Sequence, residues 1–413
     1  MAHLCNDDIL SLIFIDALQD HRYSLLTLRS VNRTWFDVAG RTPQLWTRLV
    51  FKERSHFIDL EYPKFYLSKS GAVPIDVHIT FPKYADLNEI GGVTALLRNH
   101  ASRFRSFNLH VEFYEELEAF ISSIGESKPA PFLEELVLRV RDGIESPEFP
   151  SLFTAFTPSP RLARISLSGC PFPQNFWPTI TSLNIDGTNE VNKIISFFES
   201  TPSLQDFRFK GHDYPASLYH SISPEFENPR IVSLPHLLTA NVSVPGYGAY
   251  LLRAIDAPEL TDIGLDGRHM YHFPEDNHWE VDGVSALFSL TVRHLSARSR
   301  NLRRMTLKST KFNSPLEDCT LILSGAGFPQ LEELTLIGMY IDDRALLAAG
   351  DSGGSSSLKE LTLQVCWGVT GRGLLKFVHG RRSDFHLFLL VCECVSREDV
   401  VALAAFVKVY YVQ

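Results

Sequence analysis

A glycine-rich run near the end of the chain has the spacing that surrounds a nucleophilic serine. It reads Gly350-Asp351-Ser352-Gly353-Gly354 and fits Gly-x-Ser-x-Gly. In hydrolases of this type a strand enters the motif and a helix leaves it, so that the serine can attack an acyl group. Here the order is reversed, because the pattern predicts a helix over 342–349 before the run and a strand at Leu358 after it. We therefore expect Gly350 to end a helix, and a hydrolase using Ser352 stays only as an alternative.

Metal-ligand side chains also occur, but their spacing matches no known metal site. Cys392-Glu393-Cys394 puts two thiols on one face of a predicted strand, whereas structural zinc usually takes Cys-x-x-Cys pairs. The other ligand types lie in one segment, at His269, His272, Glu275 and His278. We predict no metal and no cofactor, and we expect the cysteines to pack as small apolar side chains.

Composition and charge exclude several classes of protein. The chain has 413 residues, and 39 Lys and Arg against 48 Asp and Glu give a net charge of −9. This balance argues against a broad basic surface for nucleic acid. Six cysteines are too few for a disulfide scaffold, and we find neither a secretory signal nor a membrane span. We expect a cytoplasmic or nuclear protein, or one found in both compartments, that binds no nucleic acid and no membrane.

The elements that would position any site follow from an internal repeat. The pattern apolar-x-x-apolar-x-apolar is clearest at Leu331, Leu334 and Leu336, and again at Leu358, Leu361 and Leu363. Its last two positions lie two residues apart, so they share one face of a short strand. Ten steps from residue 104 to residue 384 give a mean spacing of 28 residues.

This repeat resembles that of leucine-rich-repeat proteins over about residues 72–390. Helical spacing between the strands occurs over 117–124, over 191–198 and after Gly371. Cys170 and Cys366 follow their strands where the family uses Asn or Cys, and a small side chain there fits a tight turn. We predict an α/β fold, a curved solenoid of short parallel strands and helices in which stacked units share one core.

The repeats supply candidate substrate contacts. Side chains between the apolar positions are expected on the exposed sheet face, among them Arg303, Glu333 and Lys359. A longer spacing implies an insertion near 267–283, whose aromatic and histidine side chains could grip a partner. The candidates there are His269, Tyr271, His272 and Trp279.

Residues 4–50 do not follow the repeat. Asp7 and Asp8 suit the first turn of a helix. The apolar residues that follow them, from Ile9 to Leu18, fall on more than one face of that helix. So small a module has too little core to be stable alone, and we expect its surplus apolar surface to meet the solenoid or another protein.

The first fifty residues resemble an F-box, and the continuation resembles that of fungal F-box proteins. The residues that carry the first resemblance are Leu4, Ile9-Leu10, Ile13-Phe14, Leu25-x-x-Leu28-Arg29-Ser30-Val31-Asn32-Arg33-x-Trp35 and Thr42-Pro43-x-Leu45-Trp46. The sequence departs from the family pattern at Cys5, where Pro is usual, and at Asn32, where Cys is frequent. The expected domains are the F-box at 1–50, a connecting segment with a degenerate first repeat at 51–103, and the repeat solenoid at 104–413.

An F-box joined to leucine-rich repeats implies a substrate-recognition subunit of an SCF-type ubiquitin ligase. Such a subunit is not an enzyme, because its F-box docks on a Skp-family adaptor and through it on a cullin, while the repeats bind a protein substrate. The alternative is a scaffold that binds the adaptor outside the ligase. The expected adaptor-binding residues are Leu4, Ile9, Leu10, Ile13, Phe14, Leu25, Leu28, Val31 and Trp35.

Overall fold

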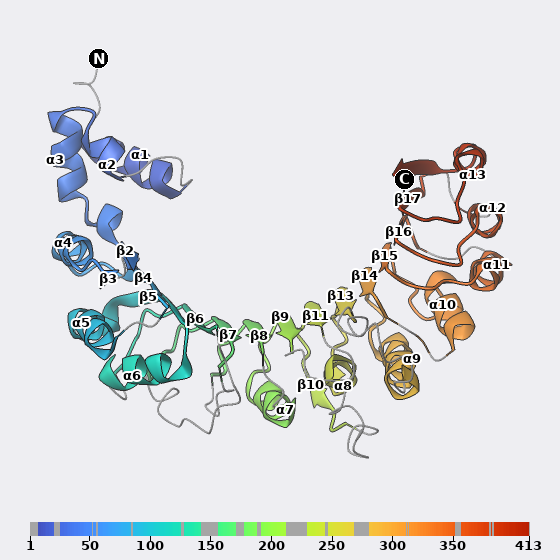
Figure 1. Cartoon of the computed structure of the whole chain (residues 1–413), viewed down its shortest axis with the longest axis horizontal. Coiled ribbons are helices and arrows are strands. Elements are labelled where there is room, and N and C mark those ends of the chain that lie inside the picture. The colour runs from blue at the N-terminus through green and yellow to red at the C-terminus, as the bar shows by residue number, and fades with distance from the viewer. Residues whose placement is uncertain are drawn as a thin grey trace. The chain divides into compact units, whose positions relative to one another are not determined.

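The chain folds into two compact units, Met1–Thr179 and Ile180–Gln413. Figure 1 shows the computed structural model. It describes residues 7–19, 25–51, 53–54, 57–83, 86–124, 128–141, 156–170, 177–187, 191–211, 229–243, 247–267, 281–310, 312, 314–351, 357–379, 381 and 384–412. None of the described helices has both the length and the apolar character needed to cross a bilayer.

Unit 1 opens with a small helical group, called here the N-terminal module (residues 7–46). Its elements are α1 (Asp7–Gln19), α2 (Leu25–Arg29), α3 (Arg33–Arg41) and the 3-10 turn η1 (Pro43–Trp46). The predicted acidic first turn of α1 is confirmed, with Asp7 and Asp8 in that turn. Helix α4 (Glu61–Ser70) packs on the module, since Trp46 meets Phe65 and Tyr66 edge-on at ring-centroid distances of 5.2 and 5.1 Å.

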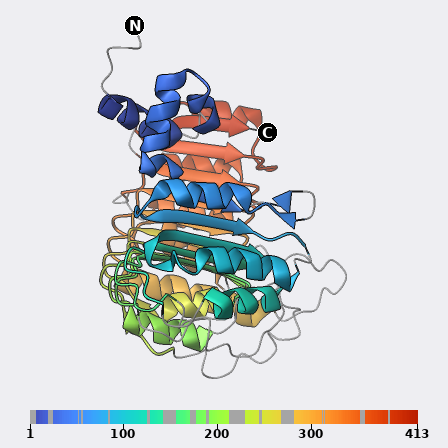
Figure 2. The ribbon, with the colours of Figure 1, turned by 90° about the vertical axis from the view of Figure 1, so that its left-hand side faces the viewer.

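A parallel sheet forms the rest of unit 1. Its strands follow one another in the order β1 (Arg48–Phe51), β4 (Ile75–Thr80), β5 (Phe104–Val111), β6 (Glu135–Val140) and β7 (Arg164–Ser168). Parallel neighbours need crossover connections, and α5 (Leu87–Leu97) and α6 (Tyr114–Ile124) lie on one side of these strands (Figure 2). A 3-10 turn precedes β5 and a small antiparallel pair follows β1: η2 (Ala101–Arg103), β2 (Glu53–Arg54) and β3 (Phe57–Ile58).

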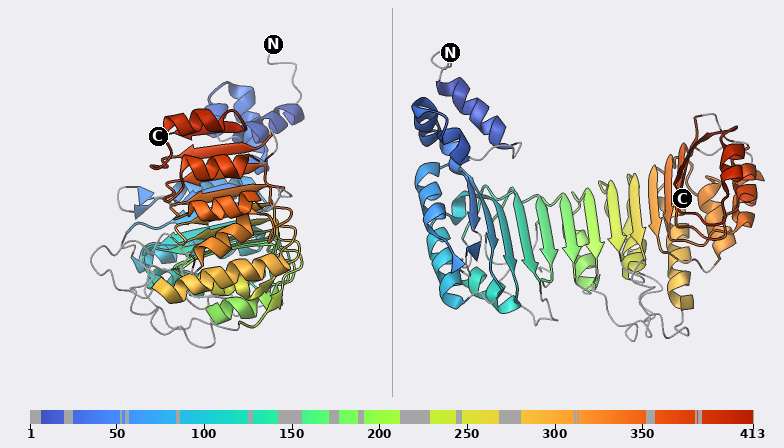
Figure 3. Two further views of the ribbon diagram at one scale, coloured as in Figure 1. Left: turned by 90° about the vertical axis from the view of Figure 1, so that its right-hand side faces the viewer. Right: turned by 45° about the horizontal axis from the view of Figure 1, so that its top comes forward.

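Unit 2 repeats the same strand-and-helix arrangement. Its sheet follows the order β8 (Ser182–Asp186), β9 (Asp206–Lys210), β11 (Thr239–Ser243), β13 (Asp262–Asp266), β14 (Arg304–Lys308), β15 (Glu333–Ile337), β16 (Glu360–Gln364), β17 (His386–Leu390) and β18 (Lys408–Val412). The helices are α7 (Val191–Ser200), α8 (Tyr247–Arg253), α9 (Val281–Arg298), α10 (Pro315–Leu323), α11 (Asp343–Asp351), α12 (Gly371–Val378) and α13 (Arg397–Leu403). They stack on one side of the strands (Figure 3), and β10 (Val232–Ser233) pairs with β12 (Ile255–Asp256).

The register of the sheets confirms the predicted repeat. Leu334 pairs with Leu361, and Leu336 with Leu363, so the last two apolar positions of each copy form continuous buried columns. Every copy found in the sequence contributes a strand, including the divergent copies at 180–188 and 237–245. The predicted helices at 117–124, 191–198, 342–349 and after Gly371 also form. The chain is a leucine-rich-repeat solenoid.

Apart from the short pairs β2–β3 and β10–β12, two described strands were not predicted, and one predicted strand ends early. β1 and β18 carry no complete copy of the repeat pattern, so only their pairing with β4 and β17 reveals them. Strand β17 ends at Leu390, so the expectation that Cys392 and Cys394 share a strand face is wrong. The chain turns after Leu390, which leaves Cys392 buried and Cys394 exposed.

The turns that leave several of the described strands contain a left-handed residue. A positive φ occurs directly after β7, β8, β14, β15, β16 and β17, at Gly169, Gly187, Ser309, Gly338, Val365 and Val391. Residues other than glycine rarely adopt this conformation, and branched residues least of all. A buried cysteine follows the left-handed residue at Cys170, Cys366 and Cys392. Each thiol donates to a carbonyl on the neighbouring strand of the previous repeat, as Cys366 does to Leu336 O of β15 at 3.3 Å. The predicted role of Cys170 and Cys366 in tight turns is confirmed.

Replacing Gly169 by Ala is expected to destabilise unit 1 by about 2 kcal/mol or more, because the left-handed conformation penalises a Cβ. An added Cβ would also lie 2.4 Å from Val140 O, a backbone atom. The measurement is urea unfolding of both variants. The matched control is Gly40→Ala within α3, where an added Cβ meets nothing within 4 Å. This substitution is expected to stabilise unit 1 by about 0.5–1 kcal/mol, because alanine favours the helix over glycine. Equal effects of the two substitutions would contradict this account of the turn.

Candidate functional site

The N-terminal module has a core of its own. Its buried residues are Leu10, Phe14, Leu25, Leu28, Val38, Ala39, Leu45 and Trp46. Trp35 packs on this core with its ring 4.8 Å from that of Phe14, and the Trp46 Nε1–H donates to Ala39 O at 2.8 Å. Four of the predicted adaptor-binding residues, Leu10, Phe14, Leu25 and Leu28, therefore hold the module together instead of presenting a surface. Their assignment as direct adaptor contacts is corrected accordingly.

The opposite face of α1 is apolar and exposed. Ile9, Leu12 and Ile13 follow the spacing i, i+3, i+4 and are 52%, 66% and 48% exposed, so they form one stripe along the helix. The prediction of apolar residues on two faces of α1 is thus confirmed, but only one face is buried within the described residues. We call Ile9, Leu12 and Ile13 the α1 stripe.

Three exposed apolar side chains of the module were not among the predicted adaptor-binding residues. They are Leu12, Leu26 and Phe36, of which Phe36 lies under the guanidinium of Arg29 at 4.3 Å. Of the other predicted adaptor contacts, Val31 is exposed, Trp35 is half-buried, and Leu4 lies outside the described residues. The spacing could have found Leu12: Leu10 and Phe14 are four residues apart on one side of α1, which places residues 9, 12 and 13 on the other.

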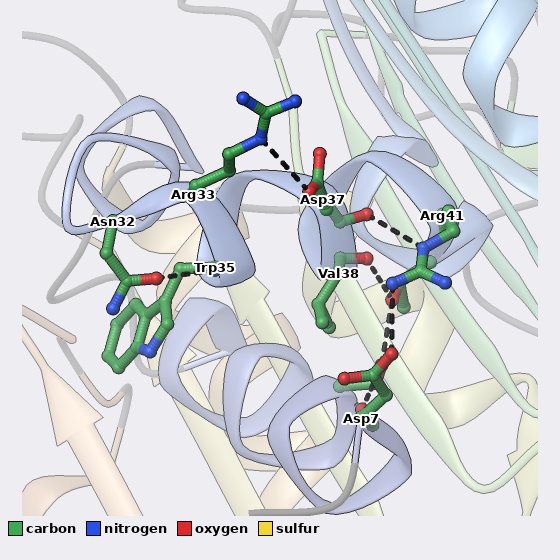
Figure 4. Close-up of polar contacts among 9 residues, drawn as sticks. Asp7, Asn32, Arg33, Trp35, Asp37, Val38 and Arg41 are labelled. Atoms are coloured by element: carbon green, nitrogen blue, oxygen red, sulfur yellow. Dashed lines mark hydrogen bonds and ion pairs between the residues drawn. The ribbon is translucent and has the colours of Figure 1, made fainter. Parts of the chain in front are cut away.

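Polar contacts fix the ends of α3 (Figure 4). Asn32 is the N-cap, and its Oδ1 accepts a hydrogen bond from the Trp35 N–H at 2.9 Å. Asparagine is among the best N-cap residues, so this departure from the family pattern has a structural role. At the other end, Arg41 pairs with Asp7 of α1 at 2.9 Å, and both side chains are exposed.

The exposed sheet face of unit 1 is polar and carries two histidines. His78 on β4 and His110 on β5 lie with ring centroids 5.4 Å apart. Burial first, and then the nearby charges of Arg139, His78 and Arg141, together lower the pKa of His110 to about 4. His110 is therefore neutral at pH 7. Beside it, Glu112 pairs with Arg141 at 2.9 Å.

Acidification is expected to destabilise unit 1 through His110. In the unfolded chain the ring takes up a proton near pH 6.5, whereas in the folded chain it does so only near pH 4. The unfolded state therefore binds more protons in this window, and stability that is fully present above pH 6.5 is lost as the pH falls toward 4. Urea unfolding of wild type and His110→Gln at several pH values measures the slope. We expect a shallower slope in the variant, and an unchanged slope would contradict the assignment.

The exposed sheet face of unit 2 consists of ordered rows of side chains. The first row runs Asp262, Arg304, Glu333, Glu360 and His386. Glu333 thus lies on a strand, as predicted. Arg303 and Lys359 do not, because each precedes the first residue of β14 or β16 by one position. They are exposed beside the strand starts, where Lys359 pairs with Glu332 at 2.8 Å. The prediction for Arg303 and Lys359 is therefore wrong by one residue. One residue matters because side-chain direction alternates along a strand.

Exposed apolar side chains gather on the last repeats of unit 2. We call them the C-terminal patch: Tyr340, Val365, Trp367, Val391, Tyr410 and Val412, together with the half-buried Phe388. They lie on neighbouring strands and on the turns that follow, as shown by the bridge between Tyr340 and Trp367. The ring of Phe388 stacks on Tyr410 at 4.4 Å with an interplanar angle of 7°. The repeat pattern marks buried positions only, so it gave no signal for this patch.

Nucleophilic or metal chemistry finds no support in the described residues. Burial raises the pKa of Cys170, Cys319 and Cys366 to about 12, so these thiols stay protonated and unreactive. No cluster of three metal-ligand side chains occurs where the structure describes the chain. Ser352 and the segment with His269, Tyr271, His272 and Trp279 lie outside the described residues.

Comparisons with known proteins show no family for this chain. No family profile matches the sequence, and no curated protein is significantly similar to it. Among solved structures, an internalin from Listeria monocytogenes is similar at 11% identity and a TM-score of 0.44, covering 94% of each chain. A protein from Bacteroides fragilis is similar at 14% identity and a TM-score of 0.37, covering 74% of this chain and 73% of the other.

Proposed function

We propose that this chain is the substrate-recognition subunit of an SCF-type ubiquitin ligase. The N-terminal module would dock on a Skp-family adaptor and through it on a cullin, and the repeats would bind a protein substrate in the cytoplasm or the nucleus. The supporting observation is the α1 stripe, an apolar helix face that no described residue covers, whereas Leu10 and Phe14 on the other side are buried. The resemblance of residues 4–49 to an F-box names the kind of partner.

The α1 stripe would be more stable buried against a helical partner than exposed to water. Three large aliphatic side chains about half exposed on one helix are costly to leave in water, at roughly 25 cal/mol per Å². A groove between helices of a partner would bury them together, which is how amphipathic helices are usually recognised. Val31 and Phe36 are further exposed apolar side chains of the module.

The repeats would position a substrate and would not catalyse a reaction themselves. A receptor of this kind holds a substrate near a charged conjugating enzyme and so raises the effective concentration of its lysines. The C-terminal patch is the best candidate for the substrate contact, because aromatic side chains are enriched in interfaces and at binding hot spots. The neighbouring row of charged residues would then select among partners.

The double variant Ile9→Asp, Ile13→Asp tests the adaptor contact. Both side chains are about half exposed, so the variant should fold normally. If each is a hot spot of about 2 kcal/mol, binding to purified adaptor should weaken by roughly 30-fold per site or more. Titration calorimetry measures the affinity, and thermal melting checks the fold.

The matched control is Leu290→Asp, Leu316→Asp, which places the same charges at two exposed leucines of α9 and α10. It should bind adaptor as wild type does. Full adaptor binding by a folded Ile9→Asp, Ile13→Asp variant would overturn the proposed docking face. Adaptor binding without cullin in the purified complex would favour the alternative, a scaffold outside the ligase.

Substrate binding is expected to depend on the C-terminal patch. Tyr340→Ala, Trp367→Ala removes two aromatic side chains that are 58% and 45% exposed. Proteins that copurify with wild type should be lost from this variant, while adaptor and cullin stay bound. Quantitative mass spectrometry of the two purifications makes the comparison, and an unchanged set of proteins would exclude the patch as the substrate site.

A further inference from the structure

The aromatic ring of Phe388, on the exposed sheet face of unit 2, has one open side. It stacks on Tyr410 of β18 at 4.4 Å with an interplanar angle of 7°, so Tyr410 covers one of its two faces. On the other side β16 carries Thr362 at the paired position, and β15 carries Thr335 beyond it. Among the described residues the only other ring beside Phe388 is that of His386 on the same strand, tilted by 31° at 6.5 Å. Because threonine is much shorter than phenylalanine, the second ring face is open above the two threonines.

Two carboxylates stand at the start of the same strands. Glu333 on β15 and Glu360 on β16 are register partners, and like charges at paired positions of neighbouring strands destabilise a sheet. The cations beside them, Arg304 and Lys359, are each paired with a different carboxylate. Lys408 lies two strands away from Glu360, at roughly 10 Å. Neither Glu333 nor Glu360 takes part in an ion pair among the described residues, so a bound cation would relieve their repulsion.

The open ring face and the carboxylates define the group that fits between them. An arginine guanidinium is planar, stacks on aromatic rings and forms paired hydrogen bonds with a carboxylate, whereas the lysine ammonium is a compact point charge. Building on the function proposed above, we propose that the protein substrate presents an arginine to β16 and β17. Its guanidinium stacks on the open face of Phe388 and pairs with Glu360. Apolar side chains next to that arginine pack on Val365 and Trp367 of the C-terminal patch.

The spacing along β16 permits these contacts together. Glu360 lies two residues before Thr362, roughly 7 Å along the strand, and side chains on a sheet lean along the strand direction. A guanidinium above Thr362 is therefore within reach of the Glu360 carboxylate, and the Thr362 hydroxyl can accept one more of its N–H groups. Val365 follows Thr362 by three residues, roughly 10 Å further along the chain. The charged and the apolar contacts of the substrate segment thus fall on opposite sides of the threonine.

Peptide libraries that differ at one fixed position test the proposal. Short immobilised peptides with random flanking residues carry arginine, lysine or glutamine at the centre, and binding of the labelled full-length chain to each library is measured. Wild type should bind the arginine library about 10-fold more tightly than the glutamine library, because only a cation both stacks on the ring and pairs with the carboxylate. The lysine library should lie between them, since an ammonium cannot stack as a plane.

Variants of the two contacts should remove this preference. Glu360→Gln and Phe388→Leu should each bind the arginine and glutamine libraries nearly alike, whereas Phe388→Tyr keeps an aromatic face and should behave as wild type. Glu360→Lys should instead prefer a matching library with glutamate at the centre. The matched control is Glu115→Gln, which removes an exposed carboxylate of α6 in unit 1 and should change nothing. Thermal melting checks the fold, and the two Glu360 variants keep the test decisive if Phe388→Leu is unstable.

Two results would overturn the proposal. One is equal or undetectable binding of the three libraries by wild type, and the other is an arginine preference that survives both Glu360→Gln and Phe388→Leu. Copurification of adaptor and cullin with the same variants separates this proposal from the proposed function. An absent arginine preference with adaptor and cullin bound would overturn only the arginine site. An arginine preference in a chain that binds neither adaptor nor cullin would support the site and exclude the ligase role.

Discussion

Two columns of buried aliphatic side chains hold the repeats together. Each column is formed by the same repeat position on successive parallel strands. No single strand of five residues can bury its apolar side chains alone, so each copy of the pattern depends on its neighbours. In unit 2 the columns continue from Met305 through Leu334 and Leu361 to Leu387 without a shift in register. The positions of the exposed rows and of the turns between repeats follow from these columns.

The same constraint explains why the N-terminal module has an exposed apolar surface. Inside the stack, both sides of a repeat are covered by the repeats beside it. The N-terminal module cannot share that core, so α1 buries one face on its own partners and leaves Ile9, Leu12 and Ile13 outside.

The buried part of the structure could be predicted, and the exposed part largely could not. Burial leaves a period in the sequence, which is why most strands of the parallel sheets and several helices could be predicted. Exposed residues have no such constraint: Trp367 and Tyr410 gave no signal, and Arg303 was placed on a strand that begins one residue later. Helical spacing puts Leu10 and Ile13 on different sides of α1, but only the packing of the module shows which side is core and which is surface.

The central claim is that α1 is the docking helix of a receptor subunit. Hydrogen exchange of the full chain with and without a Skp-family adaptor tests it directly, because amides that a partner covers or stabilises exchange more slowly. The account predicts added protection within residues 7–19 and in the rest of the N-terminal module, with the strands of unit 2 unchanged. Protection confined to the sheet of unit 2, with α1 exchanging as in the free chain, would contradict it.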